Sequence, residues 1–438
     1  MNKDIDSLRA AYNAWAAAAD FRTGRDRNKR FTYGDQWSDY VDDHNGGKMR
    51  EFDLALHRGQ RPLTNNLIRQ LVKAIVGRYR NMAAEQKFYD MTEGSDADRN
   101  RLPDLDARML EEFVISGCAV QRVVNECRVG GAGVWVDNVD CRRFFVNRFA
   151  DPRGTDISLI GMMHDMSLPE IINRFGGGSL PKARELTRIF DGTSSDDAVR
   201  FMASEALGTA SGVSMPFFTA AAGRCRVIEL WTLDSRPVTV RGRMHMQFVW
   251  RQRWLAPDGT LLYMAPSPYS HGSHPFVVTM YPLTDGEVHS FVEDIIDQQR
   301  TVNRLVVMID HMIASSAKGT LLFPVNRLAR GMTLQKVAHL WSAPDAMIPI
   351  DGRGGDMPQQ IVTNTADSGA YQALNLQMRL ISEISGLSDA VLGRNVSGAT
   401  GAELYKLQVS NASVTLTDLI ETFLSFTRAR NCMMAKSQ

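Results

Sequence analysis

The most constraining feature of this sequence is a pair of long amphipathic segments that flank a small module. Residues Gly286–Ser315 and Ser368–Ser385 both repeat apolar residues at helical spacing, and Gly386 ends the second segment. At about 1.5 Å per residue the first helix is a rod of roughly 45 Å. Its apolar stripe is broader than one partner helix can cover, which favours neighbouring subunits as the cover. Core helices of a large monomer are the alternative.

The module between the two helices has a mixed pattern. Short apolar strands over Leu321–Pro324 and Ala346–Ile350 surround a helix over Thr333–Leu340. After the second helix, a glycine-bearing loop over Leu392–Gly401 leads into a last helix from Ala402 to about Arg428. Two rods with a small domain at their end are therefore the expected architecture of this half.

The first half of the chain predicts a mixed α+β fold. It begins with helices over Asp6–Phe21 and from Asn66 to about Asn81, with the polar run Arg22–Arg30 and the aromatic turn Phe31–Trp37 between them. From Ala119 the apolar period changes toward two, which is typical of antiparallel strands. The expected strands form a first sheet over Ala119–Arg128, Gly133–Val139 and Arg143–Asn147, and a second group over Arg226–Leu233, Met244–Trp254 and Leu261–Met264. A short helix led by Ser167 and a loop over residues 190–223 separate these groups.

Composition excludes several classes of protein. The 50 basic and 49 acidic residues give a net charge of +1, whereas tight non-specific DNA binders carry a basic excess. Loose contact with DNA remains compatible with this balance. The richest apolar run, Leu305–Ile313, contains Asp310 and is too short to cross a membrane. The five cysteines lack a CxxC pair and are expected to be reduced thiols of a protein made in the cytoplasm.

Motifs for catalysis are scarce. The sequence contains no GxxxxGK[ST], HExxH or GxSxG pattern, and Gly130–Gly133 is expected to be a turn. His271 and His274 could offer two imidazoles to a metal, but a polar loop before Pro275 is favoured because no cysteine or carboxylate cluster lies nearby. We therefore expect no metal, no cofactor and no enzymatic activity.

Carboxylates on the first long helix leave one catalytic alternative open. Asp294 and Asp297 could bind a divalent metal in a nucleic-acid-processing enzyme. A solvated face or a row of salt bridges between subunits is favoured on a long amphipathic helix. The residues expected in that row are Glu293, Asp294, Asp297, Arg300 and Arg304.

Ordered motifs across nearly the whole chain give the sequence a family likeness. They are Phe31-x-x-Gly34-x-Gln36-Trp37, Arg61-Pro62-x-x-Asn65-Asn66-x-Ile68, Asp151-Pro152 before Ser167, Tyr281-Pro282-x-x-Asp285-Gly286, Asp297-x-Gln299-x-x-x-Asn303-Arg304, and Ile384-Ser385-Gly386-Leu387 before Val391-Leu392-Gly393, Ser397-Gly398 and Gly401. With these motifs the chain resembles the portal proteins of tailed bacteriophages, particularly the P22-like group.

The resemblance implies a domain plan. Its parts are a wing over residues 1–284, a first stem helix over 286–315, a clip over 317–365, a second stem helix over 368–391, a tunnel loop over 394–401, and a tunnel helix with a minimal crown over 402–438. The crown is expected to be minimal because only about ten residues follow the last predicted helix.

The resemblance also implies a function without catalysis. Portal proteins form a ring, typically of twelve subunits, at one capsid vertex of the virion, after synthesis in the bacterial host cytoplasm. DNA enters and leaves through the ring. The expected partners are further copies of the chain, the terminase large subunit, head-completion and tail adaptor proteins, the major capsid protein and double-stranded DNA, with no membrane. A head-completion adaptor is disfavoured because adaptors are usually much shorter chains.

Two groups of residues are expected to carry this function. The tunnel loop supplies small polar or basic groups for weak, exchangeable contacts with phosphates, although a plain helix–helix connection would look similar; these residues are Arg394, Asn395, Val396, Ser397, Thr400 and, one turn into the next helix, Lys406. The clip strands are expected to pair with strands of a neighbouring subunit, through Leu321, Leu322, Phe323, Met347 and Ile348.

Overall fold

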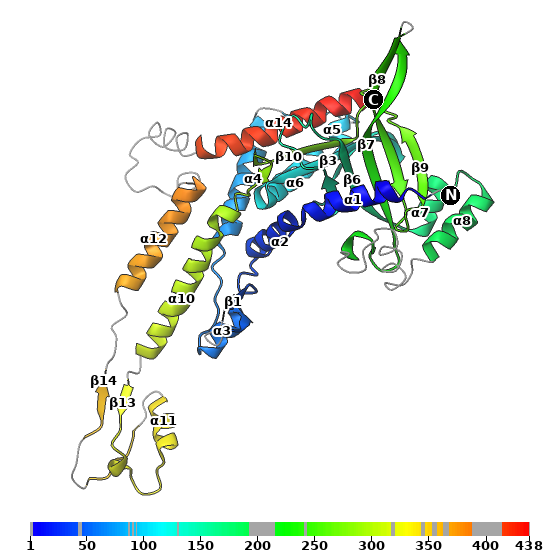
Figure 1. The fold of residues 1–438 in the computed structure, drawn as a ribbon. Helices are drawn as coiled ribbons and strands as arrows, with labels where there is room; N and C mark the ends of the chain where they lie inside the picture. The colour runs from blue at the N-terminus through cyan, green and yellow to red at the C-terminus, as the bar shows by residue number, and fades with distance from the viewer. Residues whose placement is uncertain are drawn as a thin grey trace, which may run out of the picture. The chain divides into compact units, whose positions relative to one another are not determined.

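A computed structural model gives the fold of this chain (Figure 1). It describes residues 3–42, 46–85, 88–89, 92, 94–128, 131–191, 215–240, 243–316, 320–342, 347–352, 357–361, 368–387 and 414–437. The chain divides into two compact units, which are described separately. Unit 1 contains residues 1–32, 69–294 and 386–438, and unit 2 contains residues 33–68 and 295–385.

Unit 1 contains two antiparallel sheets. The larger has the strand order β5-β6-β7-β8-β9, with β5 at Phe144–Val146, β6 at Leu159–Met166, β7 at Cys225–Val240, β8 at Arg243–Leu255 and β9 at Leu261–Pro266. The smaller has the order β10-β3-β4, with β3 at Cys118–Arg128, β4 at Gly131–Asn138 and β10 at Phe276–Met280. The predicted strand near Arg143–Asn147 was therefore assigned to the wrong sheet. The chain turns where the Arg143 amide donates to the Asp140 carbonyl at 2.9 Å, and β5 leaves to pair with β6.

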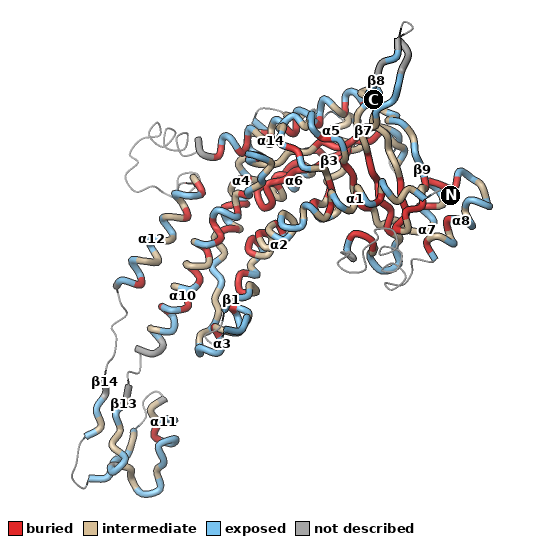
Figure 2. Tube along the Cα trace, viewed as in Figure 1, coloured by how far each residue is buried: buried red, intermediate tan, exposed pale blue. Residues whose placement is uncertain are grey.

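Helix α1 (Ile5–Ala17) packs on β5 and β6 of the larger sheet, and α2 (Ala19–Tyr33) follows it and contacts α6 (Leu102–Ser116). Leu8, Ala11 and Trp15 of α1 are buried in one apolar cluster with Phe145 and Leu230 of the sheet. Figure 2 colours buried positions along the chain red. The polar run that follows Phe21 continues the helix in α2, contrary to its prediction as a break. It stays helical because Arg25 forms ion-paired hydrogen bonds through Nε and Nη2 to Glu112 at 2.7 and 2.8 Å.

The remaining helices of unit 1 surround these sheets. They are α5 (Asp96–Asn100), α6 (Leu102–Ser116), α7 (Leu168–Phe175), α8 (Leu180–Asp191), most of α4 (Leu67–Glu85) and α14 (Val414–Ser437). The predicted cap of α7 is confirmed, because Ser167 and Glu170 exchange hydrogen bonds as a capping box. Helix α14 packs along β3 and β10 (Figure 1) and extends past the predicted end at Arg428.

Unit 2 contains the two long helices, α10 (Ile296–Ser316) and α12 (Ser368–Ser385), which lie side by side. The bounds of α12 agree with the prediction, whereas α10 begins ten residues after Gly286. The residues before α10 form the hairpin β11 (Pro282–Thr284) and β12 (Glu287–Val288), which belongs to unit 1, and a 3-10 turn over Glu293–Ile295. The Glu293 amide donates to Ser290 Oγ at 3.1 Å, and this Ser290 cap marks the start of helical structure.

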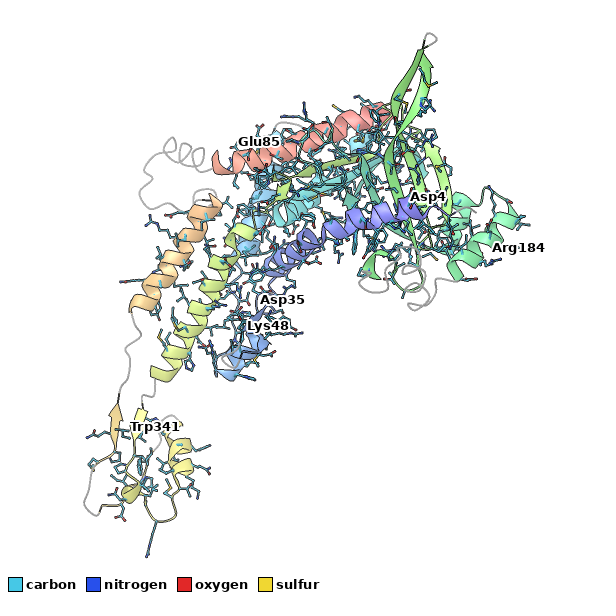
Figure 3. The ribbon with its side chains drawn as sticks, viewed as in Figure 1. Asp4, Asp35, Lys48, Glu85, Arg184 and Trp341 are labelled. Carbon is cyan, nitrogen blue, oxygen red and sulfur yellow. The ribbon has the colours of Figure 1, made fainter. Side chains whose placement is uncertain are left out.

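The small module over 320–361 differs in one strand from its prediction. Strand β13 (Thr320–Leu322) pairs antiparallel with β14 (Gln359–Ile361) of the same chain, and α11 (Leu334–Ser342), marked by Trp341 in Figure 3, accompanies them. The strand predicted over Ala346–Ile350 is absent from the described residues 347–350, where only Ile350 bridges to Leu328. Pro349 lies in this segment, and proline disfavours a regular strand ladder because it lacks an amide donor. Short β1 (Tyr40–Asp42), β2 (Lys48–Arg50) and α3 (Glu51–His57) complete unit 2.

Candidate functional site

Three of the ordered sequence motifs meet in one buried polar network of unit 2. Asn303 Nδ2 donates to Gln36 Oε1 at 2.6 Å, and Gln299 Nε2 donates to the Asn65 carbonyl at 2.6 Å. The Leu67 amide in turn donates to Gln299 Oε1 at 3.0 Å, so Gln299 satisfies an amide at the start of α4. Gln36, Gln299 and Asn303 are each at most 2% exposed. The network fixes the position of α10 against the loop that precedes α4, because each of these buried amides needs its particular partners.

Next to this network, a single carboxylate holds two arginines of α10. Glu51, buried at the start of α3, accepts from Arg300 Nη2 at 2.9 Å and from Arg304 Nε. Both arginines are therefore engaged within the chain. Their proposed contacts with a neighbouring subunit remain a prediction, and such contacts would have to be made alongside these pairs.

The three acidic residues of the predicted inter-subunit row have different surroundings. Glu293 Oε2 accepts from the Ser290 amide at 3.4 Å, which makes it part of the helix cap. Partial burial and the charge of Glu293 raise the pKa of Asp294. Asp297 lies in the first turn of α10, where a negative charge interacts favourably with the positive end of the helix dipole. Helix initiation thus accounts for Glu293 and Asp297.

The hairpin before α10 requires its glycine. Gly286 has φ +78°, and a Cβ on it would lie 3.2 Å from both Arg148 Nε and the Phe149 carbonyl oxygen. Asp285 also has a positive φ, of 55°. The Asp285-Gly286 motif therefore supplies the two residue types that most readily adopt left-handed conformations in a tight turn.

His271 and His274 serve the local turn. The Nδ1 atoms of the two rings accept from the Ser273 and Phe276 amides, at 3.1 and 3.3 Å. The His274 ring also packs edge-on against Trp250, with ring centroids 4.7 Å apart. These contacts support the polar-loop interpretation. Among the described residues no group of three or more His, Cys, Asp or Glu is arranged to hold a metal ion.

A buried ion pair that sequence reasoning missed anchors α14 in unit 1. Arg430 Nη1 and Nη2 lie 2.9 and 2.8 Å from the two carboxylate oxygens of Asp106, and both side chains are fully buried. Asp106 also accepts from Gln121 Nε2 at 3.0 Å and from Tyr89 OH at 2.9 Å. The partners are 324 residues apart, so no local pattern could have indicated the pairing.

Two further contacts extend this anchor. Tyr281 OH donates to Asp418 Oδ2 at 2.9 Å, which connects a motif residue to the first half of α14. Tyr79 lies edge-on to Phe423 with ring centroids 5.3 Å apart, and burial followed by the charge of Asp106 raises its pKa to about 12. The helix that follows the predicted tunnel loop is thus fixed to unit 1 along its length.

Among the predicted clip residues, Leu322 and Met347 are exposed and the other three are half-buried. Leu321 and Leu322 are in β13, whose Leu322 is 50% exposed, and Phe323 follows directly. Met347 is 91% exposed, and Ile348 follows it outside any strand. The predicted tunnel-loop residues, Arg394, Asn395, Val396, Ser397, Thr400 and Lys406, lie outside the described residues.

Comparisons with known proteins agree with the motifs. None of the described helices is long and apolar enough to span a membrane. A search of curated proteins finds no match. The family model of phage P22-like portal proteins matches residues 8–429, which is almost the whole chain. On this match, the chain belongs to the phage P22-like portal protein family.

Proposed function

We propose that this portal protein forms a closed ring of twelve copies at one vertex of a phage capsid, and that the ring is the conduit for double-stranded DNA during packaging and ejection. The observation that carries the proposal is the family match over residues 8–429. The match covers the two long helices and the module between them, which are the parts assigned to stem and clip. The described surface of these parts adds independent support.

Large apolar side chains are exposed on both helices and on the module of unit 2. Figure 2 colours exposed positions of these elements pale blue. Ile313 of α10 and Leu376 of α12 are 47% and 55% exposed. Several exposed large apolar residues on the same elements favour an interaction surface, because such residues are stabilised when a partner removes them from water. The exposed set comprises Met308, Ile313, Leu322, Val325, Leu334, Met347, Ile350, Met357, Tyr371, Leu376, Met378 and Ile384. Neighbouring copies in a ring would cover them.

The clip offers open strand edges for contacts between subunits. Strands β13 and β14 form a sheet of only two strands, so each has an outer edge without a strand partner among the described residues. Two-stranded sheets are marginally stable alone, and open edges readily accept a further strand. Leu321, Leu322 and Phe323 would pair across this edge. Met347 and Ile348 would contribute apolar contacts instead of a strand.

The DNA-contacting segment remains the proposed tunnel loop over 394–401. Arg394 is the only charged residue between Asp389 and Glu403, and glycines at positions 393, 398 and 401 bracket the segment. Weak ionic contacts suit a loop past which DNA must slide, because each contact has to break as the duplex advances. The near-neutral charge of the whole chain agrees with such a channel.

Deletion of residues 396–400 tests this role directly. The shortened protein is expected to form rings but to package or retain less DNA than the unaltered protein in an infection complementation assay. An alanine replacement of exposed Lys48, far from the loop in sequence, serves as the control. A deletion variant that packages and retains a full genome at the normal rate would refute the DNA contact.

Partner proteins complete the proposal. The clip over 317–365 would dock the terminase large subunit during packaging and the head-completion or tail adaptor afterwards. Unit 1, which contains most of the predicted wing, would contact the major capsid protein in the virion. These assignments follow the family plan.

Ring formation is tested by mass photometry and negative-stain imaging of the purified full chain. We expect closed rings with a mass near twelve times the 48.9 kDa of one chain. A population that stays monomeric at micromolar concentration in every salt condition would contradict the proposal.

The enzymatic alternative with Asp294 and Asp297 is excluded. Portal proteins are structural and non-enzymatic, and the chain is one of them. The roles of these two carboxylates in the structure, near the helix cap and in the first helical turn, need no metal.

A further inference from the structure

The larger sheet of unit 1 carries a hairpin that extends beyond its neighbours. Strands β7 and β8 pair along their full length, from Ile228↔Leu255 to Val240↔Arg243. Strand β6 covers β7 only up to Thr232, and β9 covers β8 only from Arg251. The segment over residues 234–249, here called the arm, therefore continues as a two-stranded ribbon that projects from the sheet (Figure 1).

Ionic contacts fix the root of the arm. Asp234 Oδ2 lies 2.8 Å from Arg253 Nη2 and 3.6 Å from Arg251 Nε. Arg253 also lies 3.4 Å from Asp4, labelled in Figure 3, whose side chain caps α1. Since the Arg253 side chain is only 13% exposed, the arm leaves the sheet in a set direction.

One face of the arm is apolar and exposed. Met244, Met246 and Phe248 alternate along β8 and therefore point to the same side. They are 76%, 63% and 70% exposed. Their cross-strand neighbours include Pro237 and Ser235, so the described side chains of this face carry no charge. The opposite face presents Arg236 opposite Gln247, both exposed.

A ribbon of this kind is not expected to stay uncovered. A hairpin of two strands is marginally stable in water, and open strand edges invite further contacts. Pro237 of β7 lacks an amide donor, and proline is tolerated in a strand where its nitrogen faces away from the paired strand. The outer edge of β7 is therefore a poor site for a further strand to pair with. The apolar face, together with the edge of β8, is the surface left for a partner.

We propose that the apolar face of the arm, formed by Met244, Met246 and Phe248, docks on a second copy of this chain next to it in the ring. The size of the patch supports this occupant. Three such side chains provide an area of a few hundred Å², whereas a stable interface with a separate protein buries about 800 Å² on each partner. The patch is thus too small to hold an unrelated protein alone, but it suits one part of a larger interface between copies. The inference rests on the proposed ring.

Site-specific photo-crosslinking in the purified ring tests the arm. Benzoylphenylalanine replaces Met246 on the apolar face, and a matched protein carries it at the adjacent Gln247 on the opposite face. We expect light to convert a large share of the Met246 protein into crosslinked dimers and higher multiples of the chain, with at least fivefold less from the Gln247 protein. Mass photometry of the same samples reports whether rings are present.

Each outcome has one meaning. Rings with equal or no crosslinks from position 246 overturn the docking of the arm and leave the ring intact. Absence of rings in the unaltered protein overturns the ring and the docking together. Crosslinks that form only after addition of capsid protein overturn the second copy as the occupant and identify the capsid as the partner.

A pair of charge substitutions gives a second readout. Phe248→Asp is expected to raise the concentration at which half of the chains are in rings by roughly tenfold or more, because a charge cannot be buried in an apolar contact without cost. Gln247→Asp is expected to change it by less than about threefold. Circular dichroism of dilute monomers controls for folding, and equal midpoints for the two folded variants would refute the docking.

Discussion

Replacing Arg430 by methionine tests how α14 is held to unit 1. The substitution keeps most of the side-chain volume but leaves the Asp106 carboxylate fully buried without its cation. Removing one member of a buried pair usually costs about 3–5 kcal/mol. Asp106 keeps its hydrogen bonds from Gln121 and Tyr89, so we expect a value near the lower end, about 3 kcal/mol.

Hydrogen exchange followed by mass spectrometry measures this effect locally. If α14 exchanges by detaching from β3 and β10, a loss of about 3 kcal/mol speeds its exchange roughly a hundredfold, since about 1.4 kcal/mol corresponds to tenfold. Arg428→Met on the exposed face of the same helix is the matched control and is expected to change exchange by less than about threefold.

A double variant separates the ion pair from packing. Arg430→Met combined with Asp106→Leu removes both charges and is expected to restore most of the protection, because replacing a buried pair by apolar groups is often nearly neutral. If Arg430→Met leaves the exchange of α14 within threefold of the unaltered protein, the pair does not anchor the helix and the reasoning is wrong.

Three other outcomes are expected. Gly286→Ala should lower the unfolding free energy of unit 1 by about 1–3 kcal/mol, because φ is +78° and a Cβ meets Arg148 and Phe149. The control Gly272→Ala has φ +66° but open space around its Cβ, so it should cost only about 1 kcal/mol. Equal shifts in melting temperature for the two variants would contradict the steric account. Burial, and to a smaller extent the charge of His271, lowers the pKa of His274 from 6.5 to about 4. The unfolded chain therefore binds the proton first as the pH falls, and the unfolding free energy should drop by up to about 3 kcal/mol between about pH 6.5 and 4. His274→Gln should remove this drop from the pH profile of the urea midpoint, and an unchanged profile would show that His274 does not cause it. Leu322→Pro in β13 should abolish rings in negative-stain images while circular dichroism shows most helix intact, and normal rings would refute strand pairing between clips.

Local patterns predicted the elements whose stability is decided nearby. The bounds of α12 follow from helical spacing, and the helix led by Ser167 follows from the preference of serine for the N-cap position. A serine–glutamate pair three residues apart forms the capping box at Ser167 and recurs at Ser290 and Glu293. There it marks the beginning of the 3-10 turn that leads into α10 at Ile296. The apolar residues from Val288 onward fall at helical spacing, and this led to the earlier predicted start at Gly286. A hairpin can bury apolar residues as a helix does, so the spacing alone did not separate the two.

Features that depend on distant partners could not be predicted in the same way. The pairing of β13 with β14 joins segments about forty residues apart, and the strand-forming residues Gln359–Ile361 have no strong alternation of their own. Arg430 and Asp106 show the limit most clearly, because each looks like a solvated residue of an amphipathic helix until the other is placed beside it. The motif residues Gln36, Asn65, Gln299 and Asn303 were found in the sequence, but their mutual contacts became evident only in the structure.

The amide network around α10 has a consequence for the conditions that the protein can withstand. Glutamine and asparagine side chains carry no net charge, so their hydrogen bonds are insensitive to Debye screening and to the titration of carboxylates and imidazoles. Their donors and acceptors are directional, and sliding α10 by one turn would part Gln299 and Asn303 from all their partners outside the helix at once. Alongside the ion pairs of Arg300 and Arg304 with Glu51, the amide network therefore holds the axial position of this helix equally well in dilute and in concentrated electrolyte.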